Sequence, residues 1–363
     1  MASDNFELSE EQSMILETVR KFAAEQLEPK ALELDEHGTF VRDHFDGLAE
    51  LGMLGIPLPE ASGGAELGLV SFVVAMEQLG RACGSTARVV LSQTALCGVA
   101  LEGHTDAEAI SSGQKLGAFV GLDSGIAATD SGDGLTLSGV APLVTAATEA
   151  DLLVVAARTA DGETVLACLD AAQAQCTAVP ALGFRASAPG RVEFQGVTVP
   201  AANVLARGAT ADARLRGVHV AAAVGGAALA IGMADAARMG AAVHAGERIA
   251  FGKPLAKQQA VALKLVDSLR ATLAARHLVY HAARLADAGR EAAESASIAK
   301  LAAVDAAVCS ADEAIQILGG FGYTVEYHAE RYYRDAKTLE VFGHVTEELR
   351  NALVPSAMSV ALL

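Results

Sequence analysis

The sequence predicts an α+β protein in which helical segments at both ends flank a small antiparallel sheet. Helix-type hydrophobic spacing dominates the first 115 residues, and short β-rich runs between turn signals follow from about residue 116. Long alanine-rich stretches of helical character then fill the rest of the chain. The 363 residues, 52% of them hydrophobic, are enough for several buried cores. We therefore expect three domains, at residues 1–115, 116–207 and 208–363.

The N-terminal domain is expected to be helical. Ser9 followed three residues later by Gln12 has the form of a capping box, so a helix should begin there. The apolar spacing at Phe45, Leu48, Leu51 and Leu54 indicates another helix. Two more apolar helices are predicted at about residues 68–79 and 85–101.

Short β-rich runs define the middle domain. Turn signals at Asp161-Gly162 and Pro189-Gly190 separate them, as expected for an antiparallel sheet of roughly 90 residues. The runs are Leu135–Leu137, Leu152–Val155, Thr164–Leu166 and Val192–Phe194. After this sheet, residues 212–246, 258–288 and 291–317 have the length of antiparallel bundle helices.

Charge and cysteine content exclude several kinds of protein. Asp and Glu number 44 against 27 Lys and Arg, which gives a formal net charge of −17. Such a surface repels phosphate backbones and anionic lipid, so we expect no nucleic-acid or membrane partner. The N-terminus has no secretion signal, and the five cysteines lie far apart without metal-site spacing. These features predict a cytoplasmic protein with reduced thiols.

Four sequence blocks identify a family. In chain order they are Val192–Leu205, Glu247–Leu255 with Gln259 beyond it, Ala314–Tyr323 and Glu330–Lys337. In this order and at these spacings the chain resembles the acyl-CoA dehydrogenase family of flavoproteins over essentially its full length. The resemblance implies the fold of that family, with a helical domain, a small β domain and a C-terminal four-helix bundle. It also implies FAD, an acyl-CoA thioester substrate, and electron-transfer flavoprotein as the acceptor.

The resemblance implies that one set of residues reaches across a dimer interface to hold the FAD of the neighbouring subunit. A guanidinium suits the FAD pyrophosphate because it is planar, permanently charged and donates two hydrogen bonds side by side. A phenyl ring can stack on a purine, and a glycine turn lets backbone N–H groups approach an anion. The set consists of Arg248, Phe251, Gln259, Gln316, Gly319 and Gly320. Arg334 and Asp335 are instead expected to form a structural ion pair.

The positions that carry the family's catalytic base are empty. Most members place a Glu just after the Arg-Asp-Ala-Lys block, where it removes the α-proton while a hydride leaves the β-carbon for the flavin. In this chain Gly343 takes that position. A minority place the Glu on the first long C-terminal helix, where this chain has Ala222 followed by Ala223.

The family's flavin-contacting loop is also missing from the middle domain. Residues 116–123 run almost directly into residues 129–134, so the loop is deleted or unrecognisable. The family has a second stretch beside the flavin, later in the chain. In this chain that stretch is Leu143-Val144-Thr145, and only Thr145 matches the family pattern.

These losses predict half of a shared active site. The chain is interpreted as the non-catalytic subunit of a heterotetrameric acyl-CoA dehydrogenase, completing the FAD site of an unlike catalytic subunit. Such assemblies are associated with bulky CoA thioesters, notably those of steroid side chains in bacteria. Two alternatives stay open. One is a homo-oligomeric flavoenzyme whose base is displaced to Glu340 or His344, and the other is an inactive scaffold that keeps only the fold.

Overall fold

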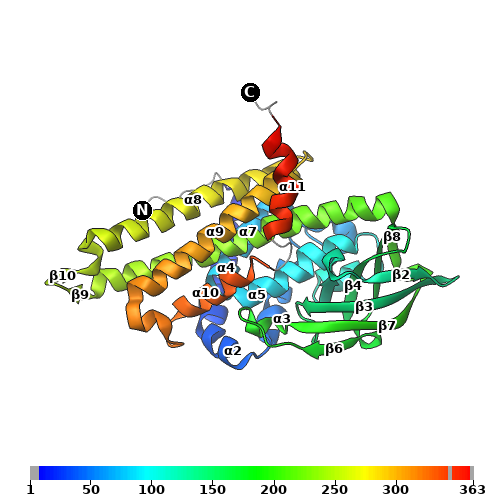
Figure 1. The fold of residues 1–363 in the computed structure, drawn as a ribbon, viewed down its shortest axis with the longest axis horizontal. Helices are drawn as coiled ribbons and strands as arrows, with labels where there is room; N and C mark the ends of the chain where they lie inside the picture. The colour runs from blue at the N-terminus through cyan, green and yellow to red at the C-terminus, as the bar shows by residue number, and fades with distance from the viewer. Residues whose placement is uncertain (1–7, 342–345, 360–363) are drawn as a thin grey trace. The chain divides into compact units, whose positions relative to one another are not determined.

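The computed structural model describes residues 8–341 and 346–359, and these form two compact units (Figure 1). The bundle unit combines Met1–Leu32, Leu67–Gly84 and Val224–Leu363. The sheet unit combines Glu33–Glu66 and Ser85–Ala223. The expected helical, β and helical regions are all present, while the division into three domains, with boundaries at residues 115/116 and 207/208, stays a prediction.

Long helices build the bundle unit, and they confirm the three predicted C-terminal helical stretches. Helices α8 and α9 pack along each other, and α4 packs on α1 and α8. The helices are α1 (Glu10–Phe22), α4 (Gly68–Ala82), the later part of α7 (Gly208–Glu247), α8 (Gln259–Asp287), α9 (Ala293–Leu318), α10 (His328–Thr338) and α11 (Thr346–Met358). Helix α1 begins at the predicted capping box, in which the Ser9 side chain accepts from the backbone N–H of Gln12.

Two glycines allow α4 and α7 to cross closely. A Cβ on Gly232 of α7 would lie 2.1 Å from the Glu77 carbonyl oxygen of α4. A Cβ on Gly80 of α4 would lie 2.4 Å from the Leu229 carbonyl oxygen of α7. The two backbones therefore touch directly, and no other residue type fits at either position without separating the helices.

Half-buried charges tie the same helices together. Arg276 of α8 pairs with Glu77 of α4, and Arg81 of α4 pairs with Asp235 of α7 at 2.8 Å. Arg238 also pairs with Asp235, one turn along α7. Burial raises the pKa of the Glu77 carboxyl, while the nearby Arg276 opposes this rise. Each charge in this network has an oppositely charged partner inside the bundle, which indicates a structural role.

The sheet is mixed, which corrects the prediction of a purely antiparallel one. Its strands run in the order β6-β7-β3-β2-β4-β5-β8, and β1 pairs with β4 in parallel. A short parallel contact also joins β2 to β4. The strands are β1 (Gly117–Val120), β2 (Ala127–Asp130), β3 (Gly134–Val144), β4 (Leu152–Arg158), β5 (Thr164–Asp170), β6 (Gln175–Ala178), β7 (Gly190–Pro200) and β8 (Val204–Arg207).

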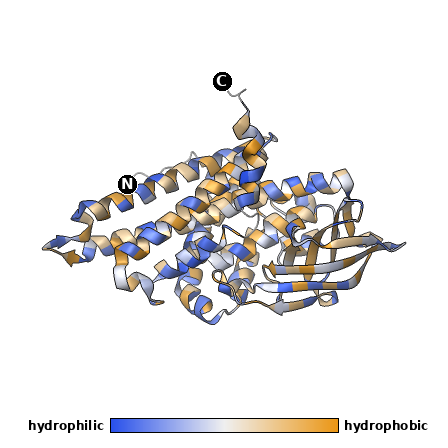
Figure 2. Cartoon of the chain, viewed as in Figure 1, coloured by the Kyte–Doolittle hydropathy of each residue, from blue (hydrophilic) through white to orange (hydrophobic). Residues whose placement is uncertain are grey.

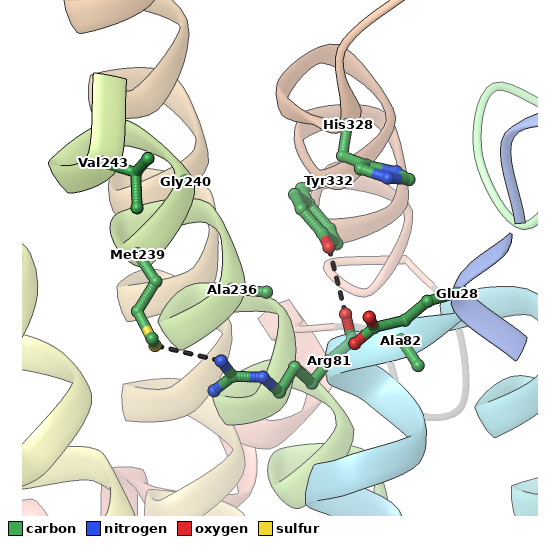
Figure 3. Close-up of a pocket in the computed structure, with 9 residues that line it drawn as sticks. All are labelled: Glu28, Arg81, Ala82, Ala236, Met239, Gly240, Val243, His328 and Tyr332. Atoms are coloured by element: carbon green, nitrogen blue, oxygen red, sulfur yellow. Dashed lines mark hydrogen bonds between the residues drawn. The ribbon is translucent and has the colours of Figure 1, made fainter. Parts of the chain in front are cut away.

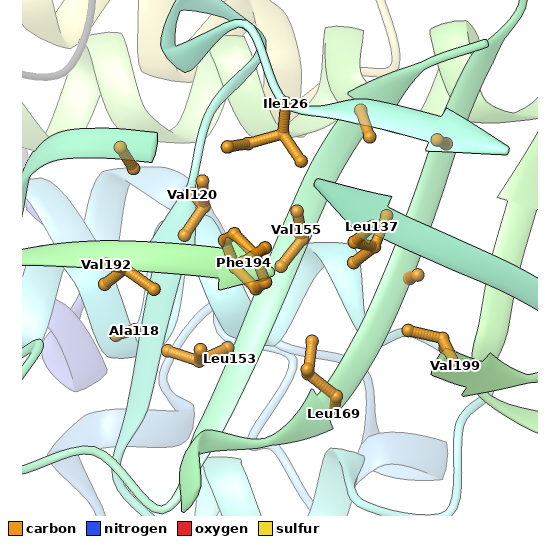
Figure 4. Close-up of a cluster of buried hydrophobic side chains, with 14 of the residues drawn as sticks. Ala118, Val120, Ile126, Leu137, Leu153, Val155, Leu169, Val192, Phe194 and Val199 are labelled. Atoms are coloured by element: carbon orange, nitrogen blue, oxygen red, sulfur yellow. The ribbon is translucent and has the colours of Figure 1, made fainter. Parts of the chain in front are cut away.

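Strands β4 and β5 are buried on both faces. On one face Val155, Leu169 and Phe194 join the apolar cluster drawn in Figure 4. On the other face Leu166 and Cys168 join a second cluster, which includes residues from the first turns of α7. Strands β3 and β7 alternate between buried and exposed residues instead, and the ribbon in Figure 2 alternates between hydrophilic and hydrophobic colours along them.

Two other predictions need adjustment. The helix expected around Phe45 to Leu54 is α3 (Arg42–Glu50), and it ends early because Gly52 adopts a left-handed conformation with φ of 70°. The helix expected at 85–101 is α5 (Gly84–Val90) followed by a π-helical stretch, Leu91–Gly98. The smaller helices are α2 (Ala31–His37) and α6 (Ala107–Ser111). Helix α7 is apolar and long enough to span a membrane, but 83% of its most apolar window is buried in the protein.

Candidate cofactor site

A hairpin at the end of α7 carries two of the predicted cofactor residues. Strands β9 (Ile249–Ala250) and β10 (Lys253–Pro254) pair antiparallel around a tight turn. The backbone of Arg248 is fixed on both sides, because its N–H bonds the His244 carbonyl and its carbonyl accepts from Leu255. Its side chain is exposed. The hairpin therefore presents a well-anchored guanidinium to the outside.

Phe251, at the tip of this hairpin, is both exposed and strained. Its side chain is 97% exposed, and its backbone φ is 52°, in the left-handed region that non-glycine residues avoid. Gly252 next to it has φ of 78°, which costs a glycine nothing. The phenyl ring of Phe251 is therefore open to contact from outside this chain.

The remaining predicted residues lie at the same end of the bundle unit. Gln259 starts α8, and Gln258 before it donates to the Ala250 carbonyl of the hairpin at 3.4 Å. Gln316 lies in the last turn of α9, and the turn that follows it packs on α7, with the Phe321 ring 6.2 Å from the His244 ring. The six residues Arg248, Phe251, Gln259, Gln316, Gly319 and Gly320 are all exposed.

The turn after α9 leaves its backbone open. Gly319 ends the helix with φ of 61°, a value that favours glycine. A Cβ on Gly319 or Gly320 would meet no atom within 4 Å, so open space adjoins the peptide groups. Gly322 differs, because a Cβ there would lie 2.8 Å from Ile315, and its role is in packing. The first two glycines therefore leave room for an anion beside the backbone.

Two neighbouring cavities in the bundle unit contain none of these residues. The larger has a volume of about 290 Å³ and lies among α7, α9 and α10, and the smaller, about 210 Å³, is drawn in Figure 3. In the smaller one the Tyr332 hydroxyl donates to the Arg81 carbonyl, and the Arg81 guanidinium contacts the Met239 sulfur. His328 lines both cavities, and burial together with the nearby Arg331 lowers its pKa to about 4. His328 is therefore neutral at pH 7, and it accepts a hydrogen bond from Arg331 at 3.1 Å.

Among the described residues, the positions at which the family carries its catalytic Glu hold no carboxylate. Ala222 and Ala223 are buried in α7, 2% and 0% exposed. Gly343 and His344 lie outside the described residues. Glu340 is half-buried and pairs with Lys337 at 2.7 Å, so its carboxylate is held by a neighbouring cation.

Arg334, expected to pair with Asp335, pairs with Glu330 of the same helix. Arg334 makes two hydrogen bonds to the Glu330 carboxylate, at 2.6 and 2.9 Å, one turn earlier on α10. Side chains at adjacent helix positions point in different directions, whereas those four apart face each other. The spacing of the charges on the helix therefore decides the partner.

Arg88 is a residue that the motif analysis missed. It lies in α5, is only 3% exposed, and donates from Nε to the Thr145 hydroxyl at 2.9 Å within the sheet unit. Burial lowers the pKa of Arg88 to about 9. The signal in the sequence was a single charge in the otherwise uncharged stretch 84–101. The hydroxyl of Thr145, which the family resemblance places beside the flavin, is thus engaged inside the sheet unit.

Comparisons with known proteins agree with the motifs. Family models for the acyl-CoA dehydrogenase N-terminal and C-terminal domains match residues 9–109 and 220–357. A probable acyl-CoA dehydrogenase of Bacillus subtilis is 34% identical, over 96% of this chain and 98% of its own length. The structure of butyryl-CoA dehydrogenase from Megasphaera elsdenii superposes with a TM-score of 0.92 at 28% identity, covering 98% of this chain and 100% of its own. A chain from a structure of the electron transferring flavoprotein of Acidaminococcus fermentans superposes with a TM-score of 0.91 at 29% identity, covering 98% of this chain and 99% of its own. The chain therefore belongs to the acyl-CoA dehydrogenase family of FAD-dependent oxidoreductases.

Proposed function

We propose that this chain is the non-catalytic subunit of a hetero-oligomeric acyl-CoA dehydrogenase. In this role it completes the FAD site of an unlike catalytic subunit and neither seats a flavin nor supplies a base of its own. FAD, when bound, accepts the hydride in the α,β-dehydrogenation of a CoA thioester. The residues of this chain position that cofactor from across the interface with the catalytic subunit.

The exposed set at the end of the bundle unit is the main support for this role. Arg248 presents a fork of donors suited to a pyrophosphate, and the strained, fully exposed Phe251 presents a flat apolar ring. Gly319 and Gly320 leave backbone open at the same end of the bundle unit. These residues therefore fit the part of FAD that a neighbouring subunit would present.

The sheet unit does not fit a flavin of its own. The Thr145 hydroxyl accepts from the buried Arg88, and both residues are 3% exposed. The segment from Gly121 to Ile126 joins β1 directly to β2, with only a 3₁₀ turn between them. This connection is too short to contain the long flavin-contacting loop of the family. The proposal therefore assigns to this chain only the half of the site that serves its partner.

The proposed substrate is a bulky CoA thioester, such as one with a steroid side chain, because assemblies of unlike subunits are associated with such substrates. Electron-transfer flavoprotein is the proposed acceptor, and the similarity to a chain from such a flavoprotein structure is in line with this. The cytoplasm is the proposed compartment. The five cysteines, which are all unpaired in the structure, fit a reducing environment.

Activity of the chain alone and of the reconstituted pair tests the proposal. The isolated chain is expected to be inactive with acyl-CoA substrates, and adding the unlike catalytic subunit should restore activity. A positioned general base contributes about 10²–10⁴-fold, so the difference in the rate of flavin reduction should be at least about 100-fold. The measurement is anaerobic single-turnover reduction of flavin by a panel of short, long and polycyclic acyl-CoA thioesters.

Single substitutions at Glu340 and His344 distinguish the proposed role from a flavoenzyme with a displaced base. If the isolated chain does reduce flavin, Glu340→Gln and His344→Gln should each be made, and a loss of at least about tenfold in either would establish a displaced base. That result would overturn the proposed role. A chain that is inactive both alone and with every unlike family member from its own genome would instead indicate a scaffold.

A further inference from the structure

A cluster of three metal-ligating side chains lies in the sheet unit, away from the cofactor residues. We propose that His104, Asp106 and Cys168 form a binding site for a zinc ion. His104 and Asp106 lie just before α6, and Cys168 lies in β5, 62 residues later in the chain. None of the motifs used to recognise the family includes these residues, and the proposal does not depend on the role of the cofactor residues.

The distances among the ligand atoms match a metal site that is nearly formed. The three ligand atoms all lie within 4.8 Å of one another. The Nδ1 atom of His104 is 3.7 Å from Oδ2 of Asp106 and 3.9 Å from Sγ of Cys168. Ligand atoms of this kind bound to one tetrahedral zinc ion are separated by roughly 3.3–3.5 Å, given bonds of about 2.0 Å to nitrogen and oxygen and about 2.3 Å to sulfur. Small side-chain rotations therefore bring all three atoms into coordination.

The surroundings hold the ligands in place. Lys115 bonds Oδ1 of Asp106 at 2.6 Å and leaves Oδ2 directed toward His104. This is the kind of outer contact that orients a ligating carboxylate. The backbone N–H of Asp106 donates to Nδ1 of His104 at 3.2 Å and so orients the ring, whose Nε2 lies 3.6 Å from Sγ of Cys168; a metal bound at Nδ1 would replace this hydrogen bond.

The Cys168 thiol must lose its proton before it can bind a metal ion. Burial and the Asp106 carboxylate raise the pKa of the Cys168 thiol to about 12, so without a metal it remains protonated at pH 7. A zinc ion would displace this proton and bind the thiolate, as zinc does at cysteine sites. The side chains of His104 and Asp106 are 12% and 24% exposed, which gives an ion a way in from solvent.

The ligand set selects zinc over harder cations. One nitrogen, one sulfur and one oxygen suit a borderline ion, whereas Ca²⁺ and Mg²⁺ require oxygen ligands. Three protein ligands leave a fourth position for water or a further ligand. Bound zinc would link the segment before α6 to the middle of β5, and so stabilise the sheet unit through the binding free energy.

Metal titration of the purified full-length chain tests this proposal. Metal-free protein should bind one equivalent of Zn²⁺ in competition with a chromophoric chelator, and Co²⁺ should give a thiolate-to-metal charge-transfer band. Binding should weaken as the pH falls from 8 to 6, since the ligands must lose protons. Zinc should raise the melting temperature of the wild-type chain.

Variants of the ligands and of an unrelated cysteine make the test specific. Cys168→Ser and His104→Gln should each weaken zinc binding by at least about tenfold and abolish the cobalt charge-transfer band. Cys309→Ser, at an exposed cysteine, should change neither. If Cys168→Ser fails to fold, Asp106→Asn at a partly exposed position provides the same comparison. Absence of stoichiometric binding, or equal binding by the wild type and the ligand variants, would overturn the proposal.

Discussion

Replacing Arg248 by alanine is expected to raise the dissociation constant of FAD in the reconstituted enzyme about 10- to 100-fold. The expected loss is that of one hydrogen bond to a charged group, roughly 1.5–3 kcal/mol, because Arg248 would donate to the pyrophosphate of its partner's FAD. The fold should be unaffected, because the side chain is exposed and the backbone bonds to His244 and Leu255 remain. Flavin titration of the assembled complex measures the effect.

Two further variants show whether the loss comes from this guanidinium. Arg248→Lys should recover only part of the affinity, since lysine keeps the charge but loses the fork of donors. Lys253→Ala removes an exposed cation from the same hairpin, and it should leave flavin affinity nearly unchanged. Equal affinity of wild type and Arg248→Ala, with the subunits still associated, would show that this chain does not complete the cofactor site.

Replacing Gly232 by alanine is expected to destabilise the bundle unit by about 3 kcal/mol or more. The added methyl group would lie 2.1 Å from the Glu77 carbonyl oxygen and 2.8 Å from the Arg81 nitrogen, both in the backbone of α4. Backbone atoms of a packed helix cannot move aside individually, so the helices must separate. The midpoint of urea unfolding, followed by circular dichroism, should fall accordingly.

Gly240 provides the matched control on the same helix. A Cβ at Gly240 meets no atom within 4 Å, so alanine there gains helix propensity without a clash. Gly240→Ala should therefore raise stability by about 0.5–1 kcal/mol. If both variants shift the midpoint in the same direction, the close approach of α4 and α7 does not determine the stability of the bundle unit.

The long helices could be predicted from the sequence, whereas the strand pairing could not. Residues 212–246, 258–288 and 291–317 have a helical pattern long enough to outweigh local exceptions, and the observed helices end within a few residues of these limits. The parallel pairing of β1 with β4 depends on contacts between Gly117–Val120 and Leu152–Val155, which local spacing does not reveal. The early end of α3 follows from one left-handed glycine, Gly52, whose conformation depends on its surroundings.

Only those residues of the candidate site that belong to sequence motifs could be predicted. Arg248 and Gly319 lie in blocks with recognisable order and spacing, and the structure brings these blocks to one end of the bundle unit. Arg88 belongs to no block, and its contact with Thr145 joins residues 57 positions apart. The approach of His104 to Cys168, 64 positions apart, is likewise set by the packing of the segment before α6 on the sheet.

The flavin content of the purified chain, alone and with its unlike partner, tests the proposed division of the active site most directly. Flavin released by denaturation is measured by absorbance and divided by the amount of each subunit. The proposed role predicts almost no FAD on the chain alone and one FAD per pair of unlike chains in the complex. A yellow homo-oligomer that carries one FAD per chain and is reduced by an acyl-CoA would contradict it.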